Sequence, residues 1–140
     1  MFGSVDGKIK GMSGTVNFQR NNLLASSFNV CINPSTIDTE SKNRDEHLKN
    51  EDFFNVAKYT TICFVSQSIV KKGSNYEAIG HLIMNGVTKK VILPFSVTKK
   101  DGTSTFVGNL QINRFDYNLN YGNKFMVGEI VKVTITTIVE

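Results

Sequence analysis

Apolar and polar residues alternate along most of this chain, and this period of two limits its fold more than any other feature. Successive side chains of a β-strand point to opposite faces, so alternation indicates a strand with one buried face. The pattern is clearest over residues 91–97, 106–112 and 115–121, and a β-branched run that favours strands covers Val131 to Val139. Weaker alternation over 14–18, 28–32 and 62–66 extends the same prediction to the first half.

Turn-forming residues separate these runs. Asn85-Gly86 lies between two alternating segments and predicts a tight hairpin. Similar signals occur at Asn21-Asn22, Lys72 to Asn75, Lys100 to Gly102 and Gly122-Asn123. The chain is therefore expected to form many short antiparallel strands within a single domain spanning residues 1–140. The alternation alone leaves a sandwich and a barrel open.

One segment, Ser41 to Phe54, breaks the alternation. It is charged and contains neither glycine nor proline, which predicts a short helical insertion. Ser41 or Asn43 is a suitable N-cap for a helix over Arg44 to Asn50. Asp52-Phe53-Phe54 then reads as a turn that drives two aromatic rings inward.

The charged residues of the chain are explained better by solubility and protection of sheet edges than by nucleic-acid binding. The chain has sixteen Lys and Arg and twelve Asp and Glu, which gives a net charge of +4. Lysines occur in pairs at 71–72, 89–90 and 99–100, each near a predicted turn, where they favour solubility and protect sheet edges. No aromatic-interleaved basic motif accompanies them, so we expect no nucleic-acid partner.

Targeting and membrane signals are weak in this sequence. No apolar run reaches the roughly 18 to 20 residues that a transmembrane helix needs. Asp6, Lys8 and Lys10 are spread through the first ten residues, so we expect no signal peptide here, although an export signal upstream of Met1 is compatible with the sequence.

The residues that most often carry chemistry are few. Two cysteines and two histidines form no metal-binding spacing, so we expect no metal and no cofactor. Cys31 and Cys63 alternate out of phase with their apolar neighbours, which places both on the outer face, where they would lie close together if their strands are neighbours. Cys31 and His47 make a conceivable nucleophile and base, but nothing brings them together, and we expect no enzyme.

Several separated motifs resemble the YceI-like proteins, and the resemblance runs from about Val5 to Glu140. In chain order, the matching stretches are Ser35 to Thr39, Arg44 to Lys49, Asp52 to Asn55, Tyr59 to Ser66, Gly80 to Lys89 and Ile112 to Tyr117. This resemblance implies an all-β, lipocalin-like antiparallel barrel of about eight strands around a long apolar channel. It also implies binding of a polyisoprenoid or a fatty-acid-like lipid, export to the periplasm, and no catalysis.

In this family a first strand precedes the position of Gly3, and Met1 to Gly3 resemble only the tail of that strand. We therefore expect an unpaired seam between Val131 to Val139 and Val5 to Lys10. The two edges either close on each other, accept a strand from a second chain, or stay open. A homodimer through the long Val131 to Val139 edge is the outcome we favour.

The candidate ligand site is the set of apolar side chains on the inward faces of the strands. The alternative is that these side chains simply fill a core, in a structural or stress-related barrel that acts through protein contacts. The predicted cavity-lining residues are Phe18, Phe28, Val30, Ile32, Ile62, Phe64, Leu82, Met84, Phe95, Val97, Phe106, Leu110, Phe115, Leu119, Val131 and Val133.

Three basic residues are candidates for contacting a lipid head group at the cavity mouth: Arg44, His47 and Arg114. For Arg44, the stronger alternative is structural, with Arg44 and Asp45 holding the helix over a barrel end. Arg114 shares the inward parity of Leu110. Its partner is then Asp45, Asp116 or a head-group anion, because a buried arginine needs one.

Overall fold

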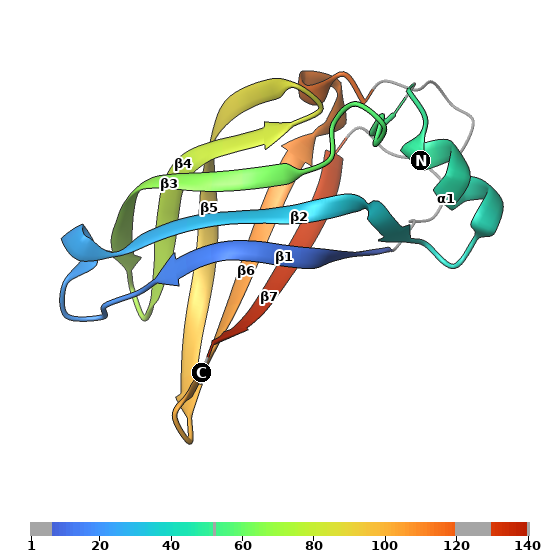
Figure 1. Cartoon of the computed structure of the whole chain (residues 1–140). Coiled ribbons are helices and arrows are strands. Elements are labelled where there is room, and N and C mark those ends of the chain that lie inside the picture. The colour runs from blue at the N-terminus through green and yellow to red at the C-terminus, as the bar shows by residue number, and fades with distance from the viewer. Residues whose placement is uncertain (1–6, 52, 120–129, 140) are drawn as a thin grey trace.

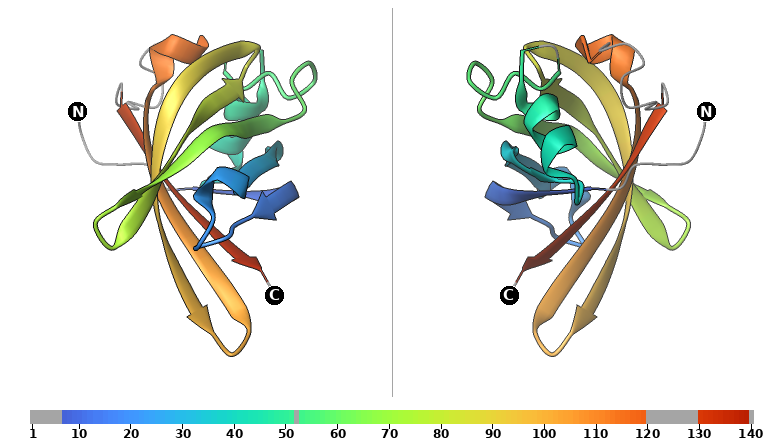
Figure 2. Two further views of the ribbon diagram at one scale, coloured as in Figure 1. Left: turned by 90° about the vertical axis from the view of Figure 1, so that its left-hand side faces the viewer. Right: turned by 90° about the vertical axis from the view of Figure 1, so that its right-hand side faces the viewer.

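A computed structural model shows the chain as one strongly curled antiparallel sheet that forms a nearly closed barrel with a helix at one end (Figure 1; Figure 2). It describes residues 7–51, 53–119 and 130–139. Their strands are hydrogen-bonded in chain order from β1 to β7, which confirms the all-β barrel. The strands are β1 (Lys8–Asn17), β2 (Ser27–Asp38), β3 (Ile62–Lys72), β4 (Asn75–Met84), β5 (Val87–Lys100), β6 (Thr103–Asn113) and β7 (Ile130–Val139).

Tight turns set the register of the central hairpins. Asn85 and Gly86 have φ of +53° and +77°, and Met84 pairs with Val87, so the predicted Asn-Gly hairpin is confirmed. Asp101 and Gly102 form the same kind of turn, with φ of +52° and +79°, between β5 and β6. Asparagine, aspartate and glycine adopt these left-handed angles more readily than other residues do.

Inward-facing side chains of the strands form the core. Phe95 lies at the centre of an aromatic cluster, with ring centroids 5.0 to 6.3 Å from those of its four neighbours. These contacts are tilted, stacked or edge-to-face, as aromatic side chains prefer. The aromatic cluster comprises Phe18, Phe28, Tyr76, Phe95 and Phe106.

The predicted helix is α1 (Lys42–Lys49), and Ser41 caps it by accepting a hydrogen bond from the backbone N–H of Arg44 at 3.4 Å. The helix therefore begins two residues earlier than expected and ends one residue earlier. Phe53 beyond it is buried and Phe54 packs against the core, which confirms that both rings turn inward. A short 3₁₀ helix, η1 (Leu23–Ala25), lies in the connection between β1 and β2.

The strand predicted over residues 115–121 is wrong where the structure describes it. Arg114 to Tyr117 form the 3₁₀ helix η2, begun by the Asn113 side chain, which accepts a hydrogen bond from the Phe115 N–H at 3.0 Å. A 3₁₀ helix repeats every three residues, so Arg114 and Tyr117 share the buried side. Phe115 consequently points outward with 45% of its surface exposed. Tyr121 and the predicted Gly122-Asn123 turn lie outside the described residues.

The two cysteines form a disulfide on the outer face of the barrel. Cys31 on β2 and Cys63 on β3 are direct cross-strand partners, with Cα atoms 4.0 Å apart. Their neighbours Ile62 and Phe64 are buried on the opposite face, so the predicted orientation of both cysteines is confirmed. The 32-residue separation between the cysteines contains α1, so the bond closes the loop that carries the helix.

Candidate functional site

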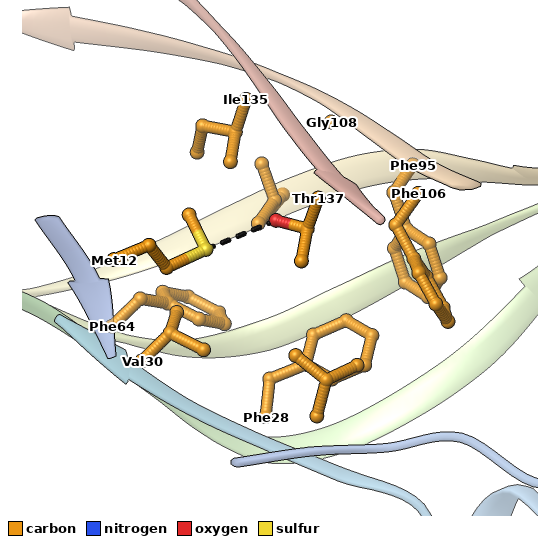
Figure 3. A pocket seen from close by; sticks show the side chains of 11 residues that line it. Met12, Phe28, Val30, Phe64, Phe95, Phe106, Gly108, Ile135 and Thr137 are labelled. Carbon is orange, nitrogen blue, oxygen red and sulfur yellow. Dashed lines mark hydrogen bonds between the residues drawn. The ribbon is translucent and has the colours of Figure 1, made fainter. Parts of the chain in front are cut away.

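The barrel has a seam between its first and last strands. Each strand is antiparallel to its neighbour, so β1 and β7 run in the same direction and an antiparallel ladder cannot join them. Among the described residues, β1 and β7 form the two ends of the sheet and are not paired with each other. A side-chain contact crosses the seam, where the Thr137 hydroxyl donates to the Met12 sulfur at 3.1 Å (Figure 3).

A groove of about 590 Å³ follows this seam. Small-molecule sites usually measure about 300 to 1,000 Å³, so the groove falls within the range of a ligand site. Its walls mix apolar side chains with glycine, serine and threonine. The lining residues are Met12, Ser13, Gly14, Thr15, Val16, Val30, Thr136, Thr137, Ile138 and Val139.

Directly inside the seam lies a small internal pocket of about 60 Å³ (Figure 3). Its lining is apolar apart from one threonine, and it reaches three rings of the aromatic cluster. Met12, Val16, Val30 and Thr137 line both the pocket and the groove, so the two spaces adjoin. The pocket is lined by Met12, Val16, Phe28, Val30, Phe64, Leu93, Phe95, Phe106, Gly108, Ile135 and Thr137.

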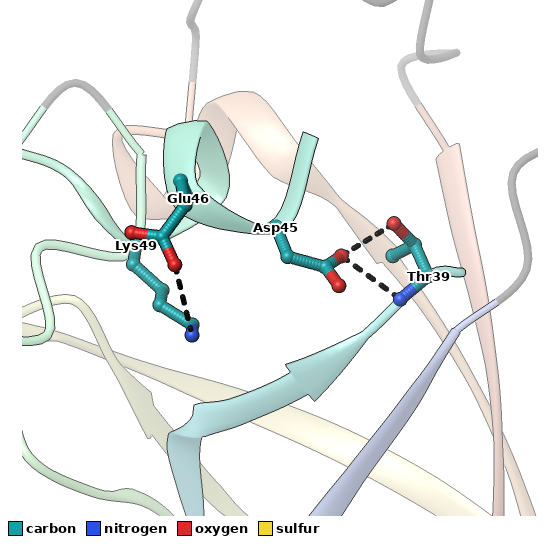
Figure 4. A network of polar contacts seen from close by, with 4 residues as sticks. All are labelled: Thr39, Asp45, Glu46 and Lys49. Carbon is teal, nitrogen blue, oxygen red and sulfur yellow. Dashed lines mark hydrogen bonds and ion pairs between the residues drawn. The ribbon is translucent and has the colours of Figure 1, made fainter. Parts of the chain in front are cut away.

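A network of polar contacts lies at the α1 end of the barrel (Figure 4). The Asp45 carboxylate accepts hydrogen bonds from the backbone N–H of Thr39 at 2.9 Å and from its hydroxyl at 2.5 Å. These bonds, the hydroxyl bond foremost, hold the pKa of the Asp45 carboxyl below its usual value. Glu46 and Lys49 form only a surface ion pair at 3.8 Å, which contributes little to stability.

Arg44 completes this network from the other side of Thr39. Its Nε donates to the Thr39 hydroxyl at 2.8 Å, and its second guanidinium nitrogen donates to the Thr39 carbonyl at 2.7 Å. Thr39 is 5% exposed and follows the end of β2 directly. Arg44 and Asp45 therefore fasten α1 to the barrel wall, which agrees with the structural alternative for both residues.

Arg114 is a buried cation, as its inward parity predicts, with 4% of its surface exposed. It donates to the Leu119 carbonyl at 2.6 Å, and its guanidinium lies 4.4 Å from the centroid of the Phe115 ring. The Asp45 carboxylate, one of the partners expected for Arg114, accepts hydrogen bonds from Thr39. Burial and the Asp116 charge raise the pKa of the neighbouring Tyr117 phenol. Arg114 thus closes the η2 turn from inside.

The model of the YceI-like domain matches residues 1–139. The chain belongs to the YceI-like family. Among curated relatives, Protein YceI of Escherichia coli O157:H7 is 42% identical over 87 residues, which are 62% of this chain and 46% of that protein. Protein YceI of Salmonella newport is 41% identical over 87 residues, which again are 62% of this chain and 46% of that protein. The match thus spans about half the length of these YceI relatives.

Several solved structures share the fold of this chain. BcnA of Burkholderia cenocepacia superposes with a TM-score of 0.90 at 25% identity, covering 96% of this chain and 87% of that one. The Campylobacter jejuni YCEI protein gives 0.86 at 24% identity, with 99% and 86% covered. A polyisoprenoid binding domain from Saccharophagus degradans gives 0.65 at 14% identity, with 80% and 75% covered, a likeness of fold alone.

Five of the sixteen predicted cavity residues of this YceI-like barrel line the internal pocket: Phe28, Val30, Phe64, Phe95 and Phe106. Phe115 does not, because η2 turns it outward. The remaining ten are buried in the core or packed against it: Phe18, Ile32, Ile62, Leu82, Met84, Val97, Leu110, Leu119, Val131 and Val133.

Sequence reasoning missed several lining residues that share the inward parity of their strands. Val16, Leu93 and Ile135 lie in alternating runs, and Met12 continues the run of Gly14 and Val16. Alternation identified the inner face but not which part of it borders empty space. The observed pocket is also far smaller than the long channel that we expected, because the aromatic cluster fills the adjoining interior.

The head-group candidates do not line the pocket or the groove. Arg44 and His47 lie on α1, and Arg114 begins η2. Within residues 7–51, 53–119 and 130–139, no three His, Cys, Asp or Glu side chains gather as a metal site. No helix in that same part of the chain is long and apolar enough to cross a membrane.

Proposed function

We propose that this YceI-like barrel binds a long apolar lipid, whose tail enters through the seam groove and ends in the internal pocket. One observation carries the proposal: the groove and the pocket share Met12, Val16, Val30 and Thr137, so the surface groove adjoins a space lined by the aromatic cluster. The name of the related Saccharophagus domain supports a polyisoprenoid or similar chain as the ligand.

The dimensions decide how such a ligand is held. The internal pocket of about 60 Å³ is well below the usual size of a ligand site, whereas the groove of about 590 Å³ is within it. Most of the chain would therefore lie in the groove. Each buried CH₂ contributes about 0.8 kcal/mol, so a long tail binds tightly without a specific polar contact. Binding, rather than catalysis, is the activity that this lining supports.

A filled barrel that acts through protein contacts is the second candidate, and the aromatic cluster favours it. Five rings occupy one part of the interior and leave little free volume there. Such a barrel would carry no lipid. The two candidates are separated by what co-purifies with the protein.

We expect native mass spectrometry of the purified protein to show a bound long-chain lipid that organic extraction releases. Met12→Glu, at the junction of groove and pocket, should abolish this bound mass because it places a charge against the apolar tail. Ile92→Glu is the matched control, because Ile92 is 54% exposed and does not line either space. A wild-type protein without lipid would favour the filled barrel.

We also propose that β7 pairs with β7 of a second copy to form a homodimer. Nine of its ten residues are β-branched and its single charge is Lys132, so this edge is a good template for pairing. β1 is a poorer one, because its register shifts twice and Gly14 has φ of +115°. In an antiparallel pair centred on Ile135, each Lys132 lies opposite Ile138 of the other copy.

Light scattering across a concentration series should show a dimer of the wild-type protein. Ile138→Lys places two like charges opposite each other at each end of the pair, and we expect it to shift the protein to monomer. Ile92→Lys adds the same charge on the outer face of β5 and should leave the dimer intact. A wild-type monomer at every concentration would rule out this pairing.

We infer an exported location for the natural protein. A disulfide between neighbouring strands is typical of oxidising compartments such as the periplasm. Family membership supports the same location.

A further inference from the structure

Met12 brings an oxidisable sulfur atom to the junction of the groove and the pocket. Both cysteines are bound in the disulfide, so Met12 and Met84 hold the thioether sulfurs of the described residues. Met12 is 37% exposed, whereas Met84 is 3% exposed and belongs to the core. A dissolved oxidant therefore reaches the Met12 sulfur first.

A β-bulge directs Met12 into the seam. Where β2 has one residue, Ile32, the facing part of β1 has two, Gly11 and Met12, and the register shifts. Gly11 has φ of +77°, an angle that favours glycine. A bulge bends its strand and redirects side chains, and the Met12 side chain here extends toward Thr137 on β7 (Figure 3). The backbone thus sets the position of this sulfur.

A weak hydrogen bond holds Met12 across the seam. The Thr137 hydroxyl donates to the Met12 sulfur at 3.1 Å, and both residues line the groove as well as the pocket. Apart from Thr137, the pocket lining is apolar. A thioether suits this position, because it is apolar and adapts its shape to a neighbouring chain. A strongly polar group at the same position would face the lipid tail directly.

We propose that Met12 is an oxidation site through which a peroxide switches off lipid binding. The sulfur lone pair attacks one oxygen of hydrogen peroxide, so that an S–O bond forms as the O–O bond breaks. The departing hydroxide takes the proton of the transferred oxygen and leaves as water. The sulfur is oxidised by two electrons to the sulfoxide, and the peroxide is reduced.

The sulfoxide acts on the lipid through its polarity. Its oxygen is a stronger acceptor than the thioether sulfur, so the Thr137 hydroxyl, which already donates to Met12, holds it at the junction. A lipid tail at this point then buries the S=O dipole against CH₂ groups, which costs free energy and lowers the affinity on the order of ten-fold. The inference rests on the proposed function for this effect, because it needs a lipid in the groove.

The test uses the full chain, treated with hydrogen peroxide and then freed of it. Peptide mass spectrometry should find Met12 oxidised on the order of ten-fold faster than Met84, whose sulfur is reached only when the barrel opens. The binding probe is cis-parinaric acid, a long polyene fatty acid that fluoresces in an apolar site. Its affinity for the treated protein should be on the order of ten-fold lower than for the untreated protein.

Two leucine variants identify the sulfur responsible, each compared with its own untreated sample. Met12→Leu has an apolar side chain of similar volume but no sulfur, so peroxide should not change its affinity for the probe. Met84→Leu is the matched control and should lose affinity as the wild-type protein does. Met1 and Met126 lie outside the described residues and stay in both variants, so any effect of their oxidation persists in Met12→Leu.

Equal oxidation of Met12 and Met84, an unchanged affinity after Met12 is oxidised, or the wild-type loss in Met12→Leu would each overturn the proposal. Circular dichroism before and after treatment separates a loss of affinity from unfolding. The proposed function fails separately, if the untreated protein binds no probe at all. That result also removes the effect on lipid, while the peptide masses still decide whether Met12 is the oxidation site.

Discussion

Replacing both cysteines by alanine should lower the free energy of unfolding by about 3 to 4 kcal/mol. The Cys31–Cys63 bond closes a loop across a separation of 32 residues, and a cross-link of that length removes roughly this much entropy from the unfolded chain. Few cross-strand pairs join β2 to β3, over Asn29 to Ile32, so the ladder alone holds these strands weakly. Urea denaturation of the wild-type and double-variant proteins measures the difference.

Reduction provides the internal control. A dithiol reductant should destabilise the wild-type protein by a similar amount and leave the Cys31→Ala, Cys63→Ala variant unchanged. The loop that the bond closes carries α1, so hydrogen exchange should rise first in α1 and in the adjoining residues 53–61. If the oxidised and reduced wild-type proteins unfold at the same urea concentration, the bond does not constrain the loop.

Phe95→Ala should cost about 3 to 5 kcal/mol of stability, which is the usual range for deleting a buried phenylalanine ring. Phe95 is 4% exposed, and its ring contacts four other rings of the aromatic cluster. Its removal also enlarges the internal pocket that it lines. A ligand that binds the folded state raises stability, so added long-chain lipid should restore part of the loss.

Phe115→Ala is the matched control for this substitution. It removes the same ring from η2, where 45% of the residue is exposed, so we expect a loss below about 1 kcal/mol. Thermal denaturation of the two variants compares the positions directly. Similar losses for both would contradict the inward position of Phe95 and the outward position of Phe115.

The sequence pattern by itself determined most of the strands and the face of most side chains, whereas the choice of a barrel over a sandwich came from the resemblance to the YceI-like proteins. Alternation has a period of two only on strands, so it identified the runs that became β2 to β6 and placed Phe28, Phe64, Leu110 and their neighbours inward. The Asn85-Gly86 turn and the Ser41 cap were equally predictable, because each depends on local backbone chemistry. The parity of Cys31 and Cys63 followed from the same rule.

Only the tertiary structure decided features that depend on several strands at once. The pairing of Cys31 with Cys63 required the register of β2 against β3. The size of the pocket required the positions of rings from different strands, since alternation gives a direction but no volume. Phe115 turned outward because the Asn113 side chain and the buried Arg114 replaced a strand by a 3₁₀ turn, and a change from period two to period three reverses the side on which a residue lies.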